Sequence, residues 1–315
     1  MNENLNKILV VIDGSYFLYF TCFAAVSEFQ KKDPLEAQHW IKDAEDVDQN
    51  NLPNLISCES FKRILKRVTM RKCETLDYYL KGHFQDQIDN ADSIDYVFAM
   101  DDFVKNNFRK ALYPEYKAQR KLAKKSFDMF KIQQYILNVI FKELEVEEKY
   151  GYHFVRVDGA EGDDVIATIF KNIGKNYSLN VLFASDRDFV QLENVHQITL
   201  FGKEVKCTVA DEDVTCSEYL LAKILLGDSA DNISKVFNRV GPKKVLKLIR
   251  NKELLKEKLK EDQDAVKQFN LNKSLISFDE IPQDLTDKIL ETVNVKLYKN
   301  NILNQKVDFR DFMSL

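Results

Sequence analysis

The sequence predicts an α/β fold in which a mostly parallel central sheet is flanked by helices and followed by a helical region. Short apolar runs such as KILVVID (7–13), YVFAM (96–100) and VLFA (181–184) have the length and composition of buried parallel strands. Segments with helical spacing separate these runs, which is the order of a βαβ chain. After residue 205 the spacing is mainly helical. We therefore expect an α/β region at residues 1–205 and a helical region at residues 206–315.

The composition is that of a globular protein from a reducing compartment. The chain has 315 residues, of which 45% are hydrophobic and 30% charged, enough to bury a sizeable core. Its five cysteines are scattered and lack a CxxC pair, so no disulfide framework is expected. The N-terminal residues contain no signal peptide pattern, and no apolar run is long enough to cross a bilayer. We expect a cytoplasmic monomer without a membrane partner.

Acidic residues gather at the ends of the predicted strands. Glu161, Asp163 and Asp164 stand at the start of a predicted helix, and Asp186 and Asp188 follow the strand at 181–184. In a parallel sheet the carboxyl ends of the strands and the starts of the following helices share one edge, so the two clusters can meet. Like charges brought together repel unless cations neutralise them. Hard oxygen ligands favour Mg²⁺ or Mn²⁺ over zinc.

The same pattern recurs at other strand ends and turns, namely at Asp13, Asp101, Asp102, Asp228 and Asp231. Each of these has a plain structural explanation, because acids are favoured in turns and in the first turn of a helix. Their repetition at successive strand ends favours the metal hypothesis.

Two basic segments bracket the acids. Residues 103–125 carry eight Lys or Arg against the single acid Glu115, with four interleaved aromatics. This composition is typical of phosphate contact with base stacking; the alternative is a solvated helix face with a few core aromatics. Residues 235–260 carry ten Lys or Arg against two acids, around Gly241-Pro242. They predict a helix–loop–helix that holds a nucleic-acid backbone, at about residues 218–250; the alternative is an ordinary surface hairpin.

Three other segments are assigned by pattern. Residues 29–57 are polar and contain two prolines, which predicts a long surface loop. Residues 61–80 predict an amphipathic helix. Residues 195–205 predict a short strand pair around Phe201-Gly202.

Several motifs together resemble the flap endonuclease and 5′→3′ exonuclease superfamily. The matching segments occur in the family's order over residues 7–250 and read VVIDGSY, FAMDD, FRKALYPEYKAQRK, GAEGDDVIA, ASDRDFVQL and GDSADNI…VGPKK. The later stretch ISFDEIPQDL is similar to the T-even-phage members called ribonuclease H. The resemblance implies a 5′-nuclease fold of the PIN type, with residues 103–130 forming a basic arch above the active site.

The resemblance also implies a role for each matching residue. Asp13, Asp102, Glu161 and Asp163 would serve a first Mg²⁺, with Asp164 close by, and Asp186, Asp188 and Asp231 a second, with Asp228 nearby; Mn²⁺ could substitute. Spacing favours Asp102 as ligand, whereas the strand end suits Asp101. Lys117 and Arg120 would be catalytic by holding the scissile phosphate, and Tyr116 would stack on a base. Further nucleic-acid contacts would come from Arg109, Lys124, Lys243 and Lys244.

One position departs from the family pattern. The loop before the lysines commonly contains a GxG turn, and here it reads Arg239-Val240-Gly241. This difference puts a monovalent-cation site in the loop in doubt.

These features predict a phosphodiesterase that removes RNA primers and DNA flaps near 5′ ends during replication, in the host cytoplasm if the chain is phage-encoded. Its substrates would be branched or nicked DNA and RNA–DNA duplexes. The alternatives are a non-catalytic binder of branched nucleic acid, a single-strand ribonuclease of the PIN type and a haloacid-dehalogenase-type phosphatase; the last needs a second Asp two residues after Asp13, where Ser15 stands. The terminal FRDFMSL predicts a packed helix in preference to a docking peptide for a sliding clamp or single-strand-binding protein.

Overall fold

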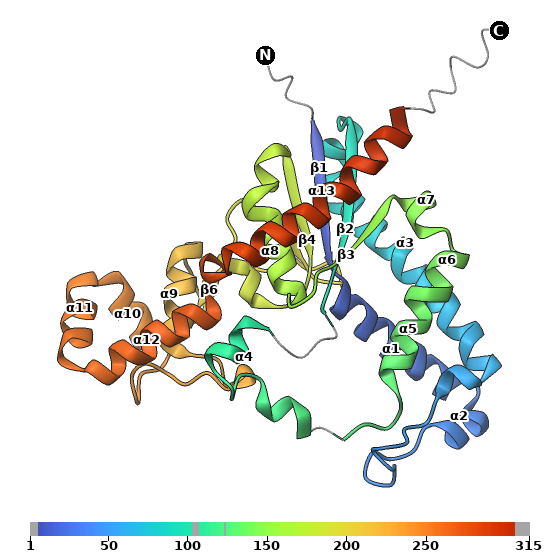
Figure 1. Cartoon of the computed structure of the whole chain (residues 1–315), viewed down its shortest axis with the longest axis horizontal. Helices are drawn as coiled ribbons and strands as arrows, with labels where there is room; N and C mark the ends of the chain where they lie inside the picture. Colours follow the sequence, from blue (N-terminus) through green and yellow to red (C-terminus); the bar gives the residue numbers. More distant parts are fainter. Residues whose placement is uncertain (1–5, 103–106, 123, 306–315) are drawn as a thin grey trace.

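A five-stranded parallel sheet forms the centre of the molecule, in the order β3-β2-β1-β4-β5 (Figure 1). The computed structural model describes residues 6–102, 107–122 and 124–305. The strands of the sheet are β1 Lys7–Asp13, β2 Ser93–Met100, β3 Tyr152–Arg156, β4 Leu179–Phe183 and β5 His196–Ile198. All neighbouring strands run parallel, which confirms the predicted sheet. A short antiparallel pair follows, β6 Thr208–Val209 and β7 Glu212–Asp213.

Helices account for most of the remaining described chain. The α-helices are α1 Gly14–Lys32, α2 Pro34–Trp40, α3 Glu59–Asp89, α4 Phe108–Leu112, α5 Met129–Tyr135, α6 Phe141–Glu143, α7 Val146–Tyr150, α8 Gly162–Asn172, α9 Cys216–Leu226, α10 Pro242–Arg250, α11 Lys252–Glu261, α12 Gln263–Ile276 and α13 Gln283–Gln305. The short 3-10 segments are Leu55–Ser57, Ala118–Leu122, Gly174–Asn176, Arg187–Gln191, Ser229–Asp231 and Phe278–Glu280, and a π-helical turn spans Ile136–Ile140. One side of the sheet carries a group of helices made up of α9, α10, α11 and α12 (Figure 1). This group is the helical region predicted for the C-terminal part of the chain.

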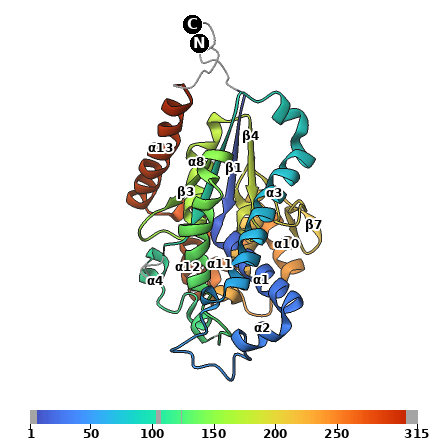
Figure 2. The same ribbon diagram turned by 90° about the vertical axis from the view of Figure 1, so that its right-hand side faces the viewer.

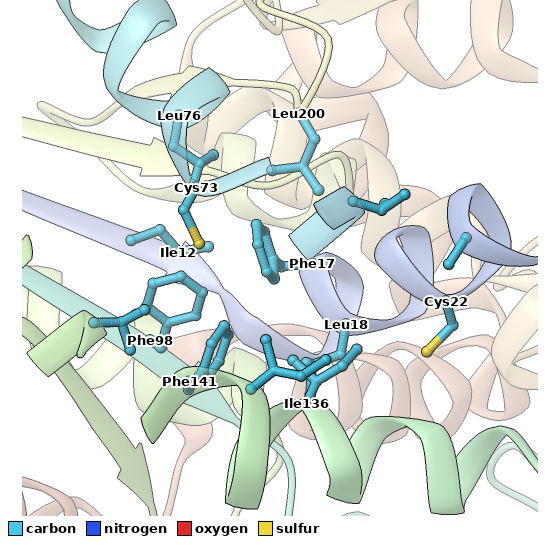
Figure 3. Close-up of a cluster of buried hydrophobic side chains, with 14 of the residues drawn as sticks. Ile12, Phe17, Leu18, Cys22, Cys73, Leu76, Phe98, Ile136, Phe141 and Leu200 are labelled. Atoms are coloured by element: carbon cyan, nitrogen blue, oxygen red, sulfur yellow. The ribbon is translucent and has the colours of Figure 1, made fainter. Parts of the chain in front are cut away.

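The sheet is covered on both faces because the side chains of a strand alternate between them. In β1, Ile8, Val10 and Ile12 share a buried cluster with residues of α1, α3 and the segment around Phe141. Figure 3 shows Ile12 in this cluster, near Cys73 of α3 and Phe17 of α1. Leu9 and Val11 point to the other face and join the core beneath α8 and α13. Figure 2 shows the resulting order, with α8 and α13 on one side of the sheet and α1 and α3 on the other. A strand buried on both faces reads as a continuous apolar run, which is why KILVVID was recognisable.

Helix α13 returns from the helical region to the sheet. Leu285, Ile289 and Val293 are buried in the same cluster as Leu9 and Val11 of β1. The boundary at residues 205/206 stays a prediction, and α13 packs with the α/β part of the chain. None of the helices in the described ranges is long and apolar enough to span a bilayer.

The predicted long loop at residues 29–57 is wrong in its first half. Helix α1 continues to Lys32, and α2 occupies Pro34–Trp40 before the irregular stretch begins. Phe29 and Ala37 are buried and anchor these turns, although the segment as a whole is polar. The helix predicted at 61–80 is confirmed within α3. The strand pair predicted at 195–205 forms only in part. Its first strand is β5, which pairs in parallel with β4. Its second strand is reduced to an antiparallel bridge between Ile198 and Glu204.

Gly14 lets the start of α1 approach β2 closely. A Cβ at this position would lie 2.2 Å from the Met100 sulfur and 2.8 Å from the Ala99 carbonyl oxygen. We expect Gly14→Ala to lower the free energy of unfolding by about 1–3 kcal/mol, because overpacking a buried contact shifts the backbone. Urea unfolding would measure this effect. The matched variant Gly82→Ala, where a Cβ has no neighbour within 4 Å, should not be destabilised.

Candidate functional site

The predicted acidic residues meet between β1 and β4, where the order of strands along the sheet changes direction. The chain proceeds from β1 through β2 to β3 on one side and then places β4 and β5 on the other. In such sheets the crevice beyond the strand ends at this switch point is the usual place for a site. Asp13 is the last residue of β1, and Asp186 follows β4, which is paired with β1 through Ile12 and Phe183. The folded sheet therefore brings two acids that are distant in sequence to one edge.

Local capping fixes the acids at their helix starts. The Asp13 carboxylate accepts a 2.9 Å hydrogen bond from Tyr16 N and caps α1. Glu161 caps α8, and the Asp164 carboxylate accepts a 3.0 Å hydrogen bond from Glu161 N, which completes a capping box. Asp186 caps the turn that follows β4 by accepting from Asp188 N at 2.9 Å. Asp228 caps the 3-10 turn Ser229–Asp231 in the same manner.

Asp101 and Asp102 diverge although they are adjacent. The Asp101 carboxylate accepts a 2.7 Å hydrogen bond from Gly162 N, and its charge acts on Asp13. The Asp102 carboxylate accepts a 2.8 Å hydrogen bond from Gly159 N in the loop before α8. Geometry therefore places Asp101 nearer the carboxylates at the strand ends, while Asp102 holds the preceding loop.

A pocket of about 220 Å³ lies at this edge of the sheet. Its acidic lining residues come from α8, the turn after β4 and the turn after α9, and are Glu161, Asp163, Asp186, Asp188, Asp228 and Asp231. Its basic lining residues are Arg109, Lys117 and Arg120. The structure thus brings together residues that span more than 120 positions of sequence, and members of both predicted acidic clusters share one cavity. Asp13, Asp101, Asp102 and Asp164 are not among its lining residues.

Burial and mutual repulsion oppose the ionisation of Asp13 and Asp163. Burial, together with the negative charges of Asp101 and Asp186, raises the pKa of Asp13 to about 7 despite its hydrogen bond from Tyr16 N. Burial also raises the pKa of Asp163 well above the ordinary aspartate value, with further contributions from Asp13 and Asp186. A cation would favour the ionised form of each group.

The segment after α4 supplies two cations to the acids. Lys117 Nζ lies 2.8 Å from Glu161 Oε1 and 3.9 Å from Asp231 Oδ2. Arg120 forms an ion pair with Asp231. Lys117 has a left-handed backbone (φ 54°), and its N–H donates to the Asp231 carbonyl oxygen at 3.1 Å. Burial opposes ionisation of Glu161, but the charges of Lys117 and Arg109 lower its pKa overall.

Two residues predicted to contact nucleic acid, Arg109 and Tyr116, line the pocket but are buried in this conformation. Arg109 is 3% exposed; it lies 2.7 Å from the Asp164 carboxylate and donates from Nε to the Leu275 carbonyl oxygen at 2.9 Å. Tyr116 is also 3% exposed, and its hydroxyl donates to Glu161 Oε2 at 3.1 Å. Its ring packs among Ile224, Ile233, Leu275 and Ile276, so it presents no face to a base in this conformation. In both cases helices from the C-terminal half cover the side chain.

The other predicted contacts lie away from the pocket. Lys124 pairs with Glu45 in the stretch after α2. Lys243 and Lys244 are exposed in the first turn of α10, and the helix–loop–helix of α9 and α10 is present as predicted. Arg239 adopts a left-handed backbone (φ 60°), so the turn forms here without the glycine of the family pattern.

Lys223 is a site residue that the sequence analysis missed. It forms an ion pair with Asp188 and lies 3.0 Å from the Asp228 carboxylate. The available signal was a single lysine within the apolar run LLAKILL of α9. A lysine on such a face needs an anionic partner.

The donor set suits hard divalent cations. The acids around the pocket outnumber the cations that pair with them, which are Arg109, Lys117, Arg120 and Lys223. Within the described ranges, no three His, Cys, Asp or Glu side chains are close enough together to hold one ion directly. Mg²⁺ suits carboxylates that lie this far apart, because it retains several waters and commonly binds only one or two carboxylates directly.

Comparison with known proteins identifies a matching family and fold. Residues 78–219 match the family described as 5′-3′ exonuclease, N-terminal resolvase-like domain. The 5′-3′ exonuclease of Buchnera aphidicola subsp. Acyrthosiphon pisum is 26% identical over 257 residues, which cover 79% of this chain and 72% of that protein. Ribonuclease H of Enterobacteria phage T4 is 27% identical over 170 residues, covering 48% and 53% of the two chains.

Other relatives are much longer than this chain. DNA polymerase I of Treponema pallidum is 30% identical over 162 residues, which cover 49% of this chain but only 15% of the polymerase. Among solved structures, the bacteriophage T5 D15 protein co-crystallised with metal ions superposes with a TM-score of 0.56 and 19% identity, covering 92% of this chain and 99% of that one. This likeness confirms the fold class.

Proposed function

We propose that this chain, which carries the 5′-3′ exonuclease N-terminal resolvase-like domain, is a divalent-metal-dependent 5′→3′ exonuclease and flap endonuclease. It hydrolyses phosphodiester bonds near the 5′ ends of RNA primers and DNA flaps during replication, in the cytoplasm. The observation that carries this proposal is the pocket in which carboxylates from distant segments face Lys117 and Arg120. The combination suits cations and a phosphate together.

The residues of the pocket have separable roles in this proposal. Asp13, Asp101, Glu161 and Asp163 would surround one ion, and Asp186, Asp188, Asp228 and Asp231 a second, with water molecules between the ion and most of these carboxylates. When bound, two such ions activate water and stabilise the charge on the attacking and leaving oxygens. Lys117 and Arg120 exchange their carboxylate partners for oxygens of the scissile phosphate and stabilise the charge that develops there.

The exposed lysines of α10 extend the contact to a duplex. Lys243 and Lys244 stand in the first turn of a nine-residue helix, where backbone N–H groups and the helix dipole also favour a phosphate. Contacts of this kind bind the backbone without reading sequence and weaken with salt. The substrate is therefore recognised by its shape, as nicked or branched DNA or an RNA–DNA duplex with a 5′ end.

The test is cleavage of end-labelled flap, nicked and RNA-primed duplexes in Mg²⁺, in Mn²⁺ and in EDTA. We expect short 5′ products in the presence of either ion and none in EDTA. Product lengths separate exonuclease from flap-endonuclease activity, and RNA-primed substrates test the role in primer removal.

Asp186→Asn should abolish Mg²⁺-dependent cleavage, by roughly 10³-fold or more if the carboxylate is a metal ligand whose loss costs several kcal/mol. Binding of the same flap substrate, measured by fluorescence anisotropy, should change little. Undiminished cleavage by this variant would show that the metal site is wrongly placed.

The alternative of a non-catalytic binder of branched nucleic acid has one observation in its favour. In the described part of the chain the carboxylates do not form a preassembled cluster for one ion. Tight binding of flap DNA without cleavage in either Mg²⁺ or Mn²⁺ would establish that alternative.

A further inference from the structure

Lys223 occupies the space between two predicted metal ligands. Its ammonium group contacts Asp188 and lies 3.0 Å from Asp228 Oδ2. The second oxygen of Asp228 accepts from Ala230 N at 2.8 Å, so both oxygens of this carboxylate already have partners. A divalent ion bound to both Asp188 and Asp228 would therefore compete with the ammonium group for their oxygens.

The surroundings hold this arrangement in place. The side chains of Lys223, Asp188 and Asp228 are 16%, 20% and 21% exposed, so water screens their charges only partly. Lys223 projects from α9, whose buried residues Ala222, Ile224 and Leu225 pack into two hydrophobic clusters. Asp228 follows directly after Gly227, which ends α9. The ammonium group and the Asp228 carboxylate are thus presented by the end of one rigid helix.

We propose that Lys223 is a positioning residue that serves as a built-in substitute cation: it neutralises Asp188 and Asp228 in the metal-free protein and would compete with a divalent ion for these two carboxylates. The inference rests on the proposed metal dependence. It differs from the role proposed for Lys117, because Lys117 lines the pocket of about 220 Å³ and Lys223 does not.

Two consequences follow from competition. Removing the ammonium group leaves two partly buried carboxylates without their cation, which destabilises the metal-free protein. The same change removes the competitor, so that a divalent ion binds more tightly. A residue that merely supported the fold, or that preorganised the ligands, would not tighten metal binding when it is removed.

The first test is Mn²⁺ binding by calorimetry to the full-length, metal-free protein. We expect Lys223→Met to bind roughly 3–10-fold more tightly, the range expected if a partly screened ion pair of about 1 kcal/mol is lost. Lys223→Arg should stay near the unmodified protein. The matched control is Lys66→Met, which removes the remote 2.8 Å pair with Glu143 and should leave Mn²⁺ affinity unchanged. Equal or weaker binding by Lys223→Met overturns the proposal.

A second measurement needs no mutation and keeps the inference testable if Lys223→Met does not fold. Acetylation of the unmodified protein by an N-hydroxysuccinimide ester, followed by mass spectrometry, reports how accessible each lysine amine is. Saturating Mn²⁺ should raise the labelling of Lys223 severalfold over EDTA, relative to Lys66. Unchanged or reduced labelling overturns the inference, whereas a protein that binds no Mn²⁺ at all refutes the proposed function itself.

Discussion

Asp13→Asn should raise the melting temperature of the metal-free protein at pH 8 and at the same time abolish cleavage. The reason is that the carboxylate is buried beside Asp101 and Asp186, which raises its pKa from the ordinary 3.8 to about 7. Keeping it ionised in the folded state is therefore unfavourable. Asparagine has nearly the same shape, carries no charge and still caps α1 by accepting from Tyr16 N.

The direction of the pH dependence follows from linkage. Between pH 4 and pH 7 the folded state holds a proton on Asp13 that the unfolded state has lost, so stability falls as pH rises through this window. The raised pKa of Asp163 acts in the same direction. Glu161 and Asp228 have lowered pKa values, and their contributions are already complete above pH 5. A pKa that differs by one between the folded and unfolded states corresponds to about 1.4 kcal/mol of stability.

The measurement is thermal unfolding in EDTA at pH 5.5 and pH 8. We expect the unmodified protein to melt at a lower temperature at pH 8 than at pH 5.5. At pH 8, Asp13→Asn should melt at least about 5 °C above the unmodified protein, because 1 kcal/mol of stability shifts the melting temperature of a chain of this length by about 2–4 °C. Mg²⁺ at pH 8 should stabilise the unmodified protein more than the variant. The exposed control Asp86→Asn should leave the pH dependence unchanged. A variant that is less stable than the unmodified protein at pH 8 would contradict the buried-charge account.

The gain in stability and the loss of activity have the same origin. A site that must attract cations collects negative charge that the apo fold tolerates poorly, and removing one charge relieves the fold while it weakens the site. The internal cations Lys117 and Lys223 offset part of this repulsion in the metal-free protein. They connect the strand-end acids to segments far away in sequence.

The sequence allowed the strand-end acids to be predicted because their position depends on local signals. A β-branched run that ends in Asp, followed by a helix start, specifies both the strand and the edge at which the acid lies, as Asp13 and Asp186 illustrate. Parallel pairing then brings such edges together without further information. The capping roles of Glu161 and Asp228 likewise follow from their place at helix starts.

Residues whose environment comes from distant segments could not be placed in this way. Arg109 and Tyr116 lie in a basic and aromatic stretch that has the composition of an exposed surface, but the end of α12 covers both of them. Only the three-dimensional position of Leu275 distinguishes a buried arginine from a phosphate contact. Lys223 was missed for the same reason, because its partners are 35 residues before it and beyond the end of its own helix.

Among the single substitutions discussed for this chain, Arg109→Met should lower the stability of the fold most. It breaks a buried ion pair and leaves the negatively charged partner in place. The Asp164 carboxylate has no exposed surface and depends on Arg109 Nη1 at 2.7 Å for its countercharge. The Leu275 carbonyl oxygen of α12 also loses its 2.9 Å hydrogen bond from Nε. Leaving one charge of such a pair buried costs about 3–5 kcal/mol. Urea unfolding at pH 8 in EDTA should show a loss of this size with an unchanged slope.

The partner variant separates the ion pair from simple loss of packing. Adding Asp164→Asn to Arg109→Met should restore part of the lost stability, because the neutral side chain can still accept from Glu161 N and leaves no buried charge. The matched control is Arg250→Met, which removes an exposed 2.8 Å pair with Glu212 and should cost less than about 1 kcal/mol. If Arg109→Met were as mild as Arg250→Met, then Arg109 would be free to leave Asp164, and the phosphate contact implied by the family resemblance would regain its support.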